Sequence, residues 1–280
     1  MYDCIIIGAG AAGVSAALTL KARGKNFILL GNPALSAKIG AAEKVTNYPG
    51  LPSAEGSGLK QAFLSSLTAS GISVTSAQVT GVYDMGGYFG VLCGESSFES
   101  KTVILATGVE AVKPVKGELE FLGRGVSYCA TCDGLLYKGK KIVVVCTSKE
   151  LEEEAEYLAS LASQMVFAPI YKGAKQLSGN VRVINKMPAE IRGGTRVQEV
   201  VFGGETISCD GVFMLKSALA PSALVPGLKT EGGHVVVDRQ CRTNLNGLFA
   251  AGDCTGRPYQ YAKAVGEANV AAHSVCDYLV

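Results

Sequence analysis

The chain has 280 residues, more than one compact domain of ordinary size usually holds, so two domains are expected. Hydrophobic residues make up 48% and charged residues 18%, and the formal net charge of +2 is too small to indicate a nucleic-acid-binding protein. The chain contains no apolar run of about 18 residues and no basic segment ahead of an apolar one, so we expect a soluble, cytoplasmic protein without membrane contact.

The first predicted elements form a strand–helix–strand unit. Residues 3–7 (DCIII) read as a short buried strand, residues 11–20 as a helix, and residues 25–30 as a second strand. The helix opens on the glycine-rich turn GAGAAG at residues 8–13. A turn of this kind between a strand and a helix predicts a dinucleotide-binding site, with the pyrophosphate at the helix amino terminus.

Each glycine of this turn has a predicted role. Gly8 permits the tight turn, Gly10 leaves room for the pyrophosphate, and Gly13 lets the helix pack closely against the strand. The second strand ends in LLGNP, without the acidic residue that usually holds the ribose. We therefore expect Asn32 or backbone groups to serve instead.

Similar strand-and-turn units follow along the chain. Residues 101–108 form a buried strand ending in a glycine turn, and residues 139–145 and 165–170 form further strands. Residues 246–253 give a short strand followed by Gly-Asp, and a long alanine-rich helix runs from about residue 259 to 279. This order predicts an α/β fold with two Rossmann-like, dinucleotide-binding domains. The larger comprises residues 1–111 and 240–280, and the smaller, residues 112–239, is inserted into it.

Nine cysteines are scattered along the chain, and only Cys129 and Cys132 form a close pair. A Cys-x-x-Cys pair allows a disulfide that opens and closes with little backbone motion. A structural zinc site is the alternative, but it needs four ligands and the sequence offers neither a second pair nor a suitably spaced histidine. The pair therefore favours redox chemistry and no metal. Asp133 follows directly, either to move the proton of thiol–disulfide exchange or to cap a helix.

Five motifs together resemble the low-molecular-weight thioredoxin reductases: GAGAAG at 8–13, NYPGLP at 47–52, ILATG at 104–108, GRGVSYCATCDG at 123–134 and GLFAAGDC at 247–254. The resemblance implies FAD as cofactor, thioredoxin as partner and a homodimer. It also implies that the FAD contacts fall on Gly8, Gly10, Gly13, Asn47, Thr107, Gly108, Gly252 and Asp253. Gln260, Tyr261 and Ala262 are expected near the flavin ring, where YQYA replaces the family's Tyr-Arg-Gln-Ala.

The inserted domain departs from this family where NADPH would bind. Its first turn, residues 146–150, reads CTSKE and contains no glycine, and glutamates occupy positions 150, 152, 153, 154 and 156. A carboxylate satisfies the helix dipole and repels a phosphate. Tyr-Lys-Gly at 171–173 replaces the basic cluster that grips the 2′-phosphate. In the alternative interpretation the glutamates are a solvated helix face, but the glycines and the basic cluster are still missing.

A smaller group within the resemblance matches better, namely the ferredoxin-dependent flavin thioredoxin reductases, which lack the NADPH motifs. The resulting hypothesis is an FAD-dependent enzyme that receives electrons from ferredoxin and reduces thioredoxin through Cys129 and Cys132. Cys132 is the preferred sulfur on the flavin side, and Lys38, Lys44, Arg257 and Lys263 are candidates for steering an acidic ferredoxin. Two alternatives remain: an FAD-dependent dithiol oxidase that passes electrons to oxygen, and a flavin-binding protein without activity.

Overall fold

The computed structural model describes residues 1–40, 42–51, 55–94, 96–109, 114–216 and 219–280. The chain forms two compact units, one of Met1–Val109 with Ala220–Val280 and one of Glu110–Leu219. The sequence places the return to the first domain at residue 240, whereas the first unit resumes at Ala220, because the segment after it packs on first-unit elements. The expected boundary at residues 111 and 112 lies outside the described residues. Within the described ranges, no helix is long and apolar enough to cross a membrane.

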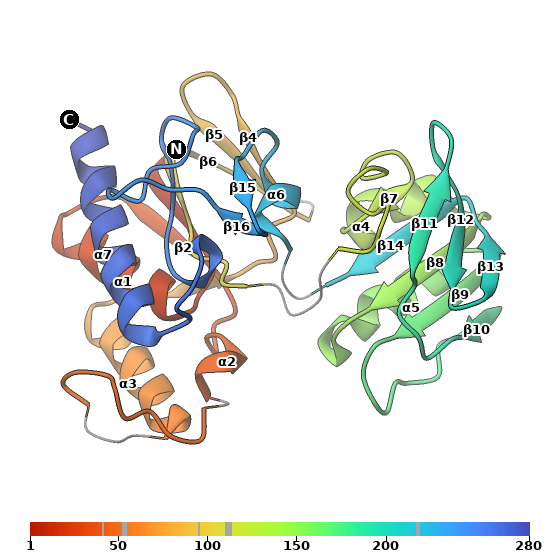
Figure 1. Ribbon diagram of the computed structural model, residues 1–280, viewed down its shortest axis with the longest axis horizontal. Helices are drawn as coiled ribbons and strands as arrows, with labels where there is room; N and C mark the ends of the chain where they lie inside the picture. Colours follow the sequence, from red (N-terminus) through yellow and green to blue (C-terminus); the bar gives the residue numbers. More distant parts are fainter. Residues whose placement is uncertain (41, 52–54, 95, 110–113, 217–218) are drawn as a thin grey trace. The chain divides into compact units, whose positions relative to one another are not determined.

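The first unit is built on a mixed sheet in the order β3-β2-β1-β6-β5-β4. β1 pairs in parallel with β2 and β6, and β17 and β5 share the other edge of the long β6 (Figure 1). The strands are β1 (Tyr2–Ile7), β2 (Phe27–Gly31), β3 (Val74–Ser76), β4 (Gly81–Asp84), β5 (Phe89–Cys93), β6 (Ser96–Leu105) and β17 (Leu248–Ala250), with β15 (Thr230–Glu231) and β16 (His234–Val235) forming a separate pair. The central strands are buried on both faces, as the apolar run of β1 predicts.

Two alanine-rich helices lie side by side in this unit, α1 (Ala11–Ala22) and α7 (Tyr261–Tyr278) (Figure 1). Ala16 on α1 and Ala268 and Ala272 on α7 are completely buried. Their small side chains allow the two helices to approach closely. α1 contacts β1, and α7 contacts β17. The remaining helices are α2 (Ala37–Gly40), α3 (Gly56–Ala69), α6 (Pro221–Leu224) and the 3₁₀ turn η3 (Asp253–Thr255).

The second unit contains a parallel sheet in the order β10-β9-β8-β14-β7 and an antiparallel sheet in the order β11-β12-β13. The helix α5 packs on β8 and β9, and β12 contacts β14. The elements are β7 (Val126–Ser127), α4 (Ala130–Asp133), η1 (Gly134–Tyr137), β8 (Lys141–Cys146), η2 (Lys149–Leu151), α5 (Glu152–Leu161), β9 (Gln164–Pro169), β10 (Val181–Val183), β11 (Glu190–Gly193), β12 (Val197–Phe202), β13 (Glu205–Ser208) and β14 (Gly211–Leu215). The parallel strands and their helix form the expected second Rossmann-like layer.

Candidate functional site

The glycine-rich turn joins β1 to α1. Gly8 has φ of +113°, and a Cβ atom there would collide with the carbonyl oxygen of Ala106. A Cβ atom on Gly13 would collide with the carbonyl oxygen of Gly8. In contrast, a Cβ atom on Gly10 would lie 4.0 Å from its nearest neighbour, Ser36 Cβ. The space beside Gly10 at the amino end of α1 is therefore open, as a phosphate-binding turn requires.

Thr107 and Gly108 follow β6 at the same edge of the sheet. The buried Oγ1 atom of Thr107 has no oxygen or nitrogen partner among the described residues, and the thiol of Cys254 lies beside it. Gly108 has φ of +68° and open space around its Cα atom. An unsatisfied buried polar group costs about 1–3 kcal/mol, so Thr107 fits the contact with a polar ligand group.

Gly252 and Asp253 follow β17 and are held by two side chains of α7. Gly252 N donates a hydrogen bond to Glu267 Oε2 at 2.9 Å, and Lys263 Nζ donates to the Gly252 carbonyl oxygen at 2.9 Å. Lys263 and Glu267 also form an ion pair at 3.1 Å. Burial raises the pKa of Asp253, and the positive charges of Lys263 and Lys38 oppose this increase. The supporting pair Lys263–Glu267 was not predicted, although its spacing of four residues on one helix is a detectable signal.

Two residues expected at the flavin come together in the structure. Asn47 Nδ2 donates a hydrogen bond to Gln260 Oε1 at 2.6 Å, and Tyr261 OH donates to the carbonyl oxygen of Lys38 at 3.2 Å. Ala262 is exposed at the start of α7. Pro52, the last residue of the NYPGLP motif, lies outside the described residues.

Asn32 follows β2, where an acidic residue usually holds the ribose. Its Oδ1 atom accepts a hydrogen bond from Ala34 N at 2.8 Å. The side-chain oxygen therefore shapes the turn after β2, and a contact with a ribose hydroxyl would come from the amide nitrogen.

In the second unit, Cys129 and Cys132 form a disulfide with their Cα atoms 5.4 Å apart. Cys129 is buried and caps α4, because its sulfur accepts a hydrogen bond from Cys132 N at 3.1 Å. Cys132 is exposed. A reductant that reaches the disulfide therefore meets the sulfur of Cys132, and the sulfur of Cys129 is placed to leave as a thiolate that a backbone N–H group stabilises.

Asp133 lies directly beside this disulfide loop. Ser127 Oγ donates a hydrogen bond to Asp133 Oδ2 at 2.6 Å and accepts one from Cys129 N at 3.1 Å. The alternative role of Asp133 as a helix cap is not seen, because its side chain makes no capping hydrogen bond. The hydrogen bond from Ser127 therefore orients the carboxyl group of the residue that follows Cys132. A carboxyl group next to a thiol can exchange a proton with it.

Leu135 and Leu136 follow the disulfide loop in η1 and are 65% and 66% exposed. The two leucines thus form exposed apolar surface close in sequence to the disulfide. Neither residue was identified from the sequence, because a short 3₁₀ turn carries no periodic pattern.

The turn after β8 is held by hydrogen bonds within the turn and to β14. Thr147 N donates to the Leu215 carbonyl oxygen at 2.9 Å, and the Cys146 thiol donates to the Ser148 carbonyl oxygen at 3.2 Å. Ser148 also caps η2 through its side chain. These side chains occupy the position of the glycines in a phosphate-binding turn, as the sequence predicts.

Glu152 is the main departure from the solvated helix face. It is only 7% exposed, and its Oε1 atom accepts hydrogen bonds from Tyr171 OH and Lys175 N, each at 3.0 Å. Tyr171 and Lys175 follow β9, so the carboxylate lies at the carboxyl end of β8 and β9. Burial raises the pKa of Tyr171, and its hydrogen bonds to Cys146 and Glu152 add to this increase. The Glu152 carboxyl group thus lies at the edge of the sheet where a dinucleotide phosphate binds in folds of this type.

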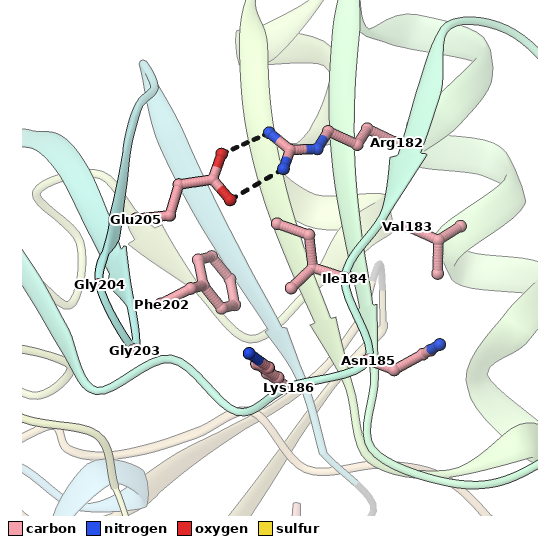
Figure 2. Close-up of a pocket in the computed structure, with 9 residues that line it drawn as sticks. All are labelled: Arg182, Val183, Ile184, Asn185, Lys186, Phe202, Gly203, Gly204 and Glu205. Atoms are coloured by element: carbon pink, nitrogen blue, oxygen red, sulfur yellow. Dashed lines mark hydrogen bonds and ion pairs between the residues drawn. The ribbon is translucent and has the colours of Figure 1, made fainter.

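A surface hollow of the second unit lies between the end of β10 and the β12–β13 turn (Figure 2). Arg182 and Glu205 face each other there and form a bidentate ion pair, with Nη2 and Oε2 2.8 Å apart. Lys186 and Phe202 also line this hollow (Figure 2). The lining residues carry no thiol, so this hollow is not the dithiol site.

Six of the free cysteines are buried, as expected for small apolar residues, whereas Cys93 is half-buried. Burial raises the pKa of Cys4 to about 12 and that of Cys254 to about 11. These thiols are therefore protonated and unreactive at neutral pH.

The chain was compared with known proteins. Residues 2–268 match the family model of the pyridine nucleotide-disulphide oxidoreductases. A ferredoxin-flavin thioredoxin reductase from Clostridium acetobutylicum has a TM-score of 0.91 and 43% identity, over 99% of this chain and 97% of that chain. A thioredoxin reductase from Gloeobacter violaceus has a TM-score of 0.78 and 29% identity, over 99% and 94%.

A curated thioredoxin reductase from Treponema pallidum is 30% identical over 99% of this chain and 97% of its own length. The match therefore includes the glycine-rich turn, the disulfide loop and the Gly252–Asp253 turn together. The chain belongs to the pyridine nucleotide-disulphide oxidoreductase family, as an oxidoreductase of the thioredoxin reductase type.

Proposed function

We propose that this chain is a flavin thioredoxin reductase that receives electrons from reduced ferredoxin and not from NADPH. The observation that carries the proposal is the buried, hydrogen-bonded carboxylate of Glu152 at the carboxyl end of β8 and β9. A dinucleotide binds at this edge of an open α/β sheet. Its diphosphate would meet the Glu152 carboxylate there, and like charges repel. The glycine-free turn at 146–150 removes the space as well.

FAD is the cofactor of the proposed reaction, and the first unit would hold it. The open space beside Gly10 and the amino end of α1 suits its pyrophosphate, and Asn32 suits a ribose. The buried hydroxyl of Thr107, which has no oxygen or nitrogen partner in the part of the chain that the structure describes, and the open space at Gly108 suit further polar groups of the cofactor. Asp253, Asn47 and Gln260 would contribute further contacts. When bound, FAD accepts single electrons and passes them on as a pair.

The second unit would carry the disulfide chemistry. Two electrons break the Cys129–Cys132 bond at the exposed sulfur of Cys132, and Cys129 leaves as a thiolate that accepts the hydrogen bond of Cys132 N. Asp133 supplies or receives the accompanying proton. The dithiol then passes its two electrons and two protons to the thioredoxin disulfide through a mixed disulfide, and the Cys129–Cys132 bond forms again.

Ferredoxin would approach the first unit. Of the four basic residues considered for its steering, Lys38 donates a hydrogen bond to the Val109 carbonyl oxygen and Lys263 is bound within the Gly252 turn. Lys44 and Arg257 are exposed. They are therefore the better candidates for attraction of an acidic partner. The homodimer that the family resemblance implies and the cytoplasmic location expected from the sequence stay predictions.

The test is an anaerobic titration of the purified flavoprotein with reduced ferredoxin, NADPH and NADH, followed by flavin absorbance and by thioredoxin reduction. We expect ferredoxin to bleach the flavin and drive thioredoxin reduction, and micromolar NADPH to do neither. Bleaching by micromolar NADPH would overturn the proposal. Oxygen consumption with a small dithiol, without thioredoxin reduction, would instead identify a dithiol oxidase. The Cys132→Ser variant is the control, because its flavin should still bleach while thioredoxin reduction is lost.

A further inference from the structure

The second unit contains a buried ion pair that the disulfide chemistry described above does not use. Lys216 Nζ lies 2.7 Å from Glu118 Oε1, and the two side chains are 2% and 0% exposed. Lysine and glutamate are almost never fully buried unless paired, and removing both charges from water cancels much of what their attraction contributes. A stabilising role therefore does not by itself explain why these two charged residues are buried in the unit.

The carboxylate of Glu118 connects the ion pair to the disulfide loop. Tyr128 OH donates a hydrogen bond to Glu118 Oε1 at 2.8 Å, and Val115 N donates to Glu118 Oε2 at 2.8 Å. Tyr128 is buried and directly precedes Cys129. Both oxygens of the carboxylate are thus used, and one of them binds the residue next to the redox disulfide.

The three side chains come from separate parts of the second unit. Val115 and Glu118 lie near the start of the unit, where the chain enters it, and Lys216 follows β14 shortly before the chain leaves it. Tyr128 follows β7, which pairs with β14. The network therefore ties the entering and leaving segments to the residue before Cys129, all within one unit.

The backbone at Tyr128 determines where the sulfur of Cys129 lies. Cys129 has an extended conformation (φ −124°, ψ 108°), from which its sulfur caps α4. Ser127 Oγ accepts the hydrogen bond of Cys129 N, and the Tyr128 hydroxyl is bound to Glu118. Both contacts hold the segment that leads to Cys129. Two thiols held at bonding distance have a high effective concentration for each other, which favours the disulfide over reaction with an external thiol.

We propose that Lys216, Glu118 and Tyr128 are positioning residues for the Cys129–Cys132 couple, and that they set how readily this disulfide is reduced. The network anchors Tyr128 and so keeps the two sulfurs together. A loosened anchor lowers their effective concentration and shifts the exchange with glutathione toward the reduced protein. In that exchange the protein disulfide takes two electrons and two protons from two glutathione thiols, which become one glutathione disulfide. The proposal does not depend on which donor reduces the flavin.

The test uses Tyr128→Phe in the purified holoenzyme, because this change removes only the hydroxyl and leaves the ion pair in place. Samples are equilibrated anaerobically in glutathione buffers, quenched with an alkylating reagent and scored for modified Cys129 and Cys132. We expect the equilibrium constant for reduction to rise about ten-fold, which corresponds to a potential about 30 mV higher for a two-electron couple. The unfolding midpoint is measured in parallel, because a merely structural residue would lower it and leave the redox equilibrium unchanged.

Two further variants make the result decisive. Glu118→Leu with Lys216→Met leaves no charge to bury and removes the Glu118 acceptor of the Tyr128 hydroxyl. It is expected to shift the equilibrium in the same direction, and it decides the question if Tyr128→Phe does not fold. Arg182→Gln breaks the exposed pair with Glu205 in the same unit and should leave the redox equilibrium at its wild-type value. An equilibrium constant within two-fold of wild type in the folded network variants, at any stability, would overturn the proposal.

Discussion

The phenolic hydroxyl of Tyr171 donates a hydrogen bond to the carboxylate of Glu152 at 3.0 Å, from the loop after β9 to the start of α5. The same carboxylate accepts a hydrogen bond from Lys175 N. Two donors from the loop after β9 therefore hold the Glu152 carboxylate at the carboxyl end of the strand.

These hydrogen bonds predict a stability difference between two neighbouring glutamates. Glu152→Ala leaves the Lys175 amide without its acceptor and the Tyr171 hydroxyl with only the Cys146 sulfur, so we expect a loss of about 1–3 kcal/mol in the free energy of unfolding. Glu153→Ala, on the exposed face of the same helix, should change it by less than about 0.5 kcal/mol. Urea unfolding followed by circular dichroism measures both. Equal losses in the two variants would show that Glu152 is an ordinary surface residue.

The exposed Leu135 and Leu136 predict a partner-specific defect. The double change Leu135→Ser with Leu136→Ser removes apolar area beside the disulfide, and we expect KM for thioredoxin to rise about ten-fold, the equivalent of about 1.4 kcal/mol of binding. Reduction of a small aromatic disulfide, which needs no such contact area, should stay at the wild-type rate. An equal loss with both substrates would place the defect in the disulfide and not in docking.

The sequence predicted the parts of the fold that local patterns determine. The turn GAGAAG defined β1, α1 and β2, and the Cys129–Cys132 pair was recognised from its spacing. The return to the first unit at Ala220 was missed, because α6 and the β15–β16 pair are too short to show a period.

The burial of Glu152 could not be predicted for a different physical reason. Helical periodicity places a glutamate at this position among charged neighbours, and its partner Tyr171 is separated from it by 19 residues and a strand. The Lys216–Glu118 pair joins residues 98 apart in the chain. Such contacts depend on tertiary packing, which carries no signal in a single sequence.

Asp133 provides a test of proton transfer at the disulfide. Asp133→Asn keeps a hydrogen-bond partner for Ser127 and removes the group that exchanges a proton with the thiol, so we expect the rate of thioredoxin reduction to fall about 10²-fold. Ser127→Ala keeps the carboxyl group but removes its hydrogen bond and the acceptor of Cys129 N, and it should cost less than the Asp133 change. Stopped-flow measurement of dithiol exchange distinguishes the two. A wild-type rate in Asp133→Asn would remove this residue from the chemistry.

Glu190 predicts how the second unit responds to acid. It pairs with Lys116 at 2.7 Å and with Arg192 at 2.6 Å, and the hydrogen bonds and charges of these residues lower its pKa below the ordinary value of 4.5. The folded protein therefore binds this proton less readily than the unfolded chain. The stabilisation is present above pH 4.5 and is lost as the pH falls through the lowered pKa.

We expect the urea midpoint of the wild-type protein to decrease as the pH is lowered from about 5 to about 3, and the decrease to be shallower in Glu190→Gln, which has no carboxyl group to protonate at this position. Glu205, paired with Arg182, and Glu156, bonded to Ser178, also have lowered pKa values and account for part of the remaining slope. Glu156 also lies 3.9 Å from Lys175 Nζ, so all three carboxylates have a charged partner at the surface, and 1 M NaCl should reduce their contributions through screening. A slope in Glu190→Gln identical to that of the wild type at low salt would show that this ion pair does not contribute to stability.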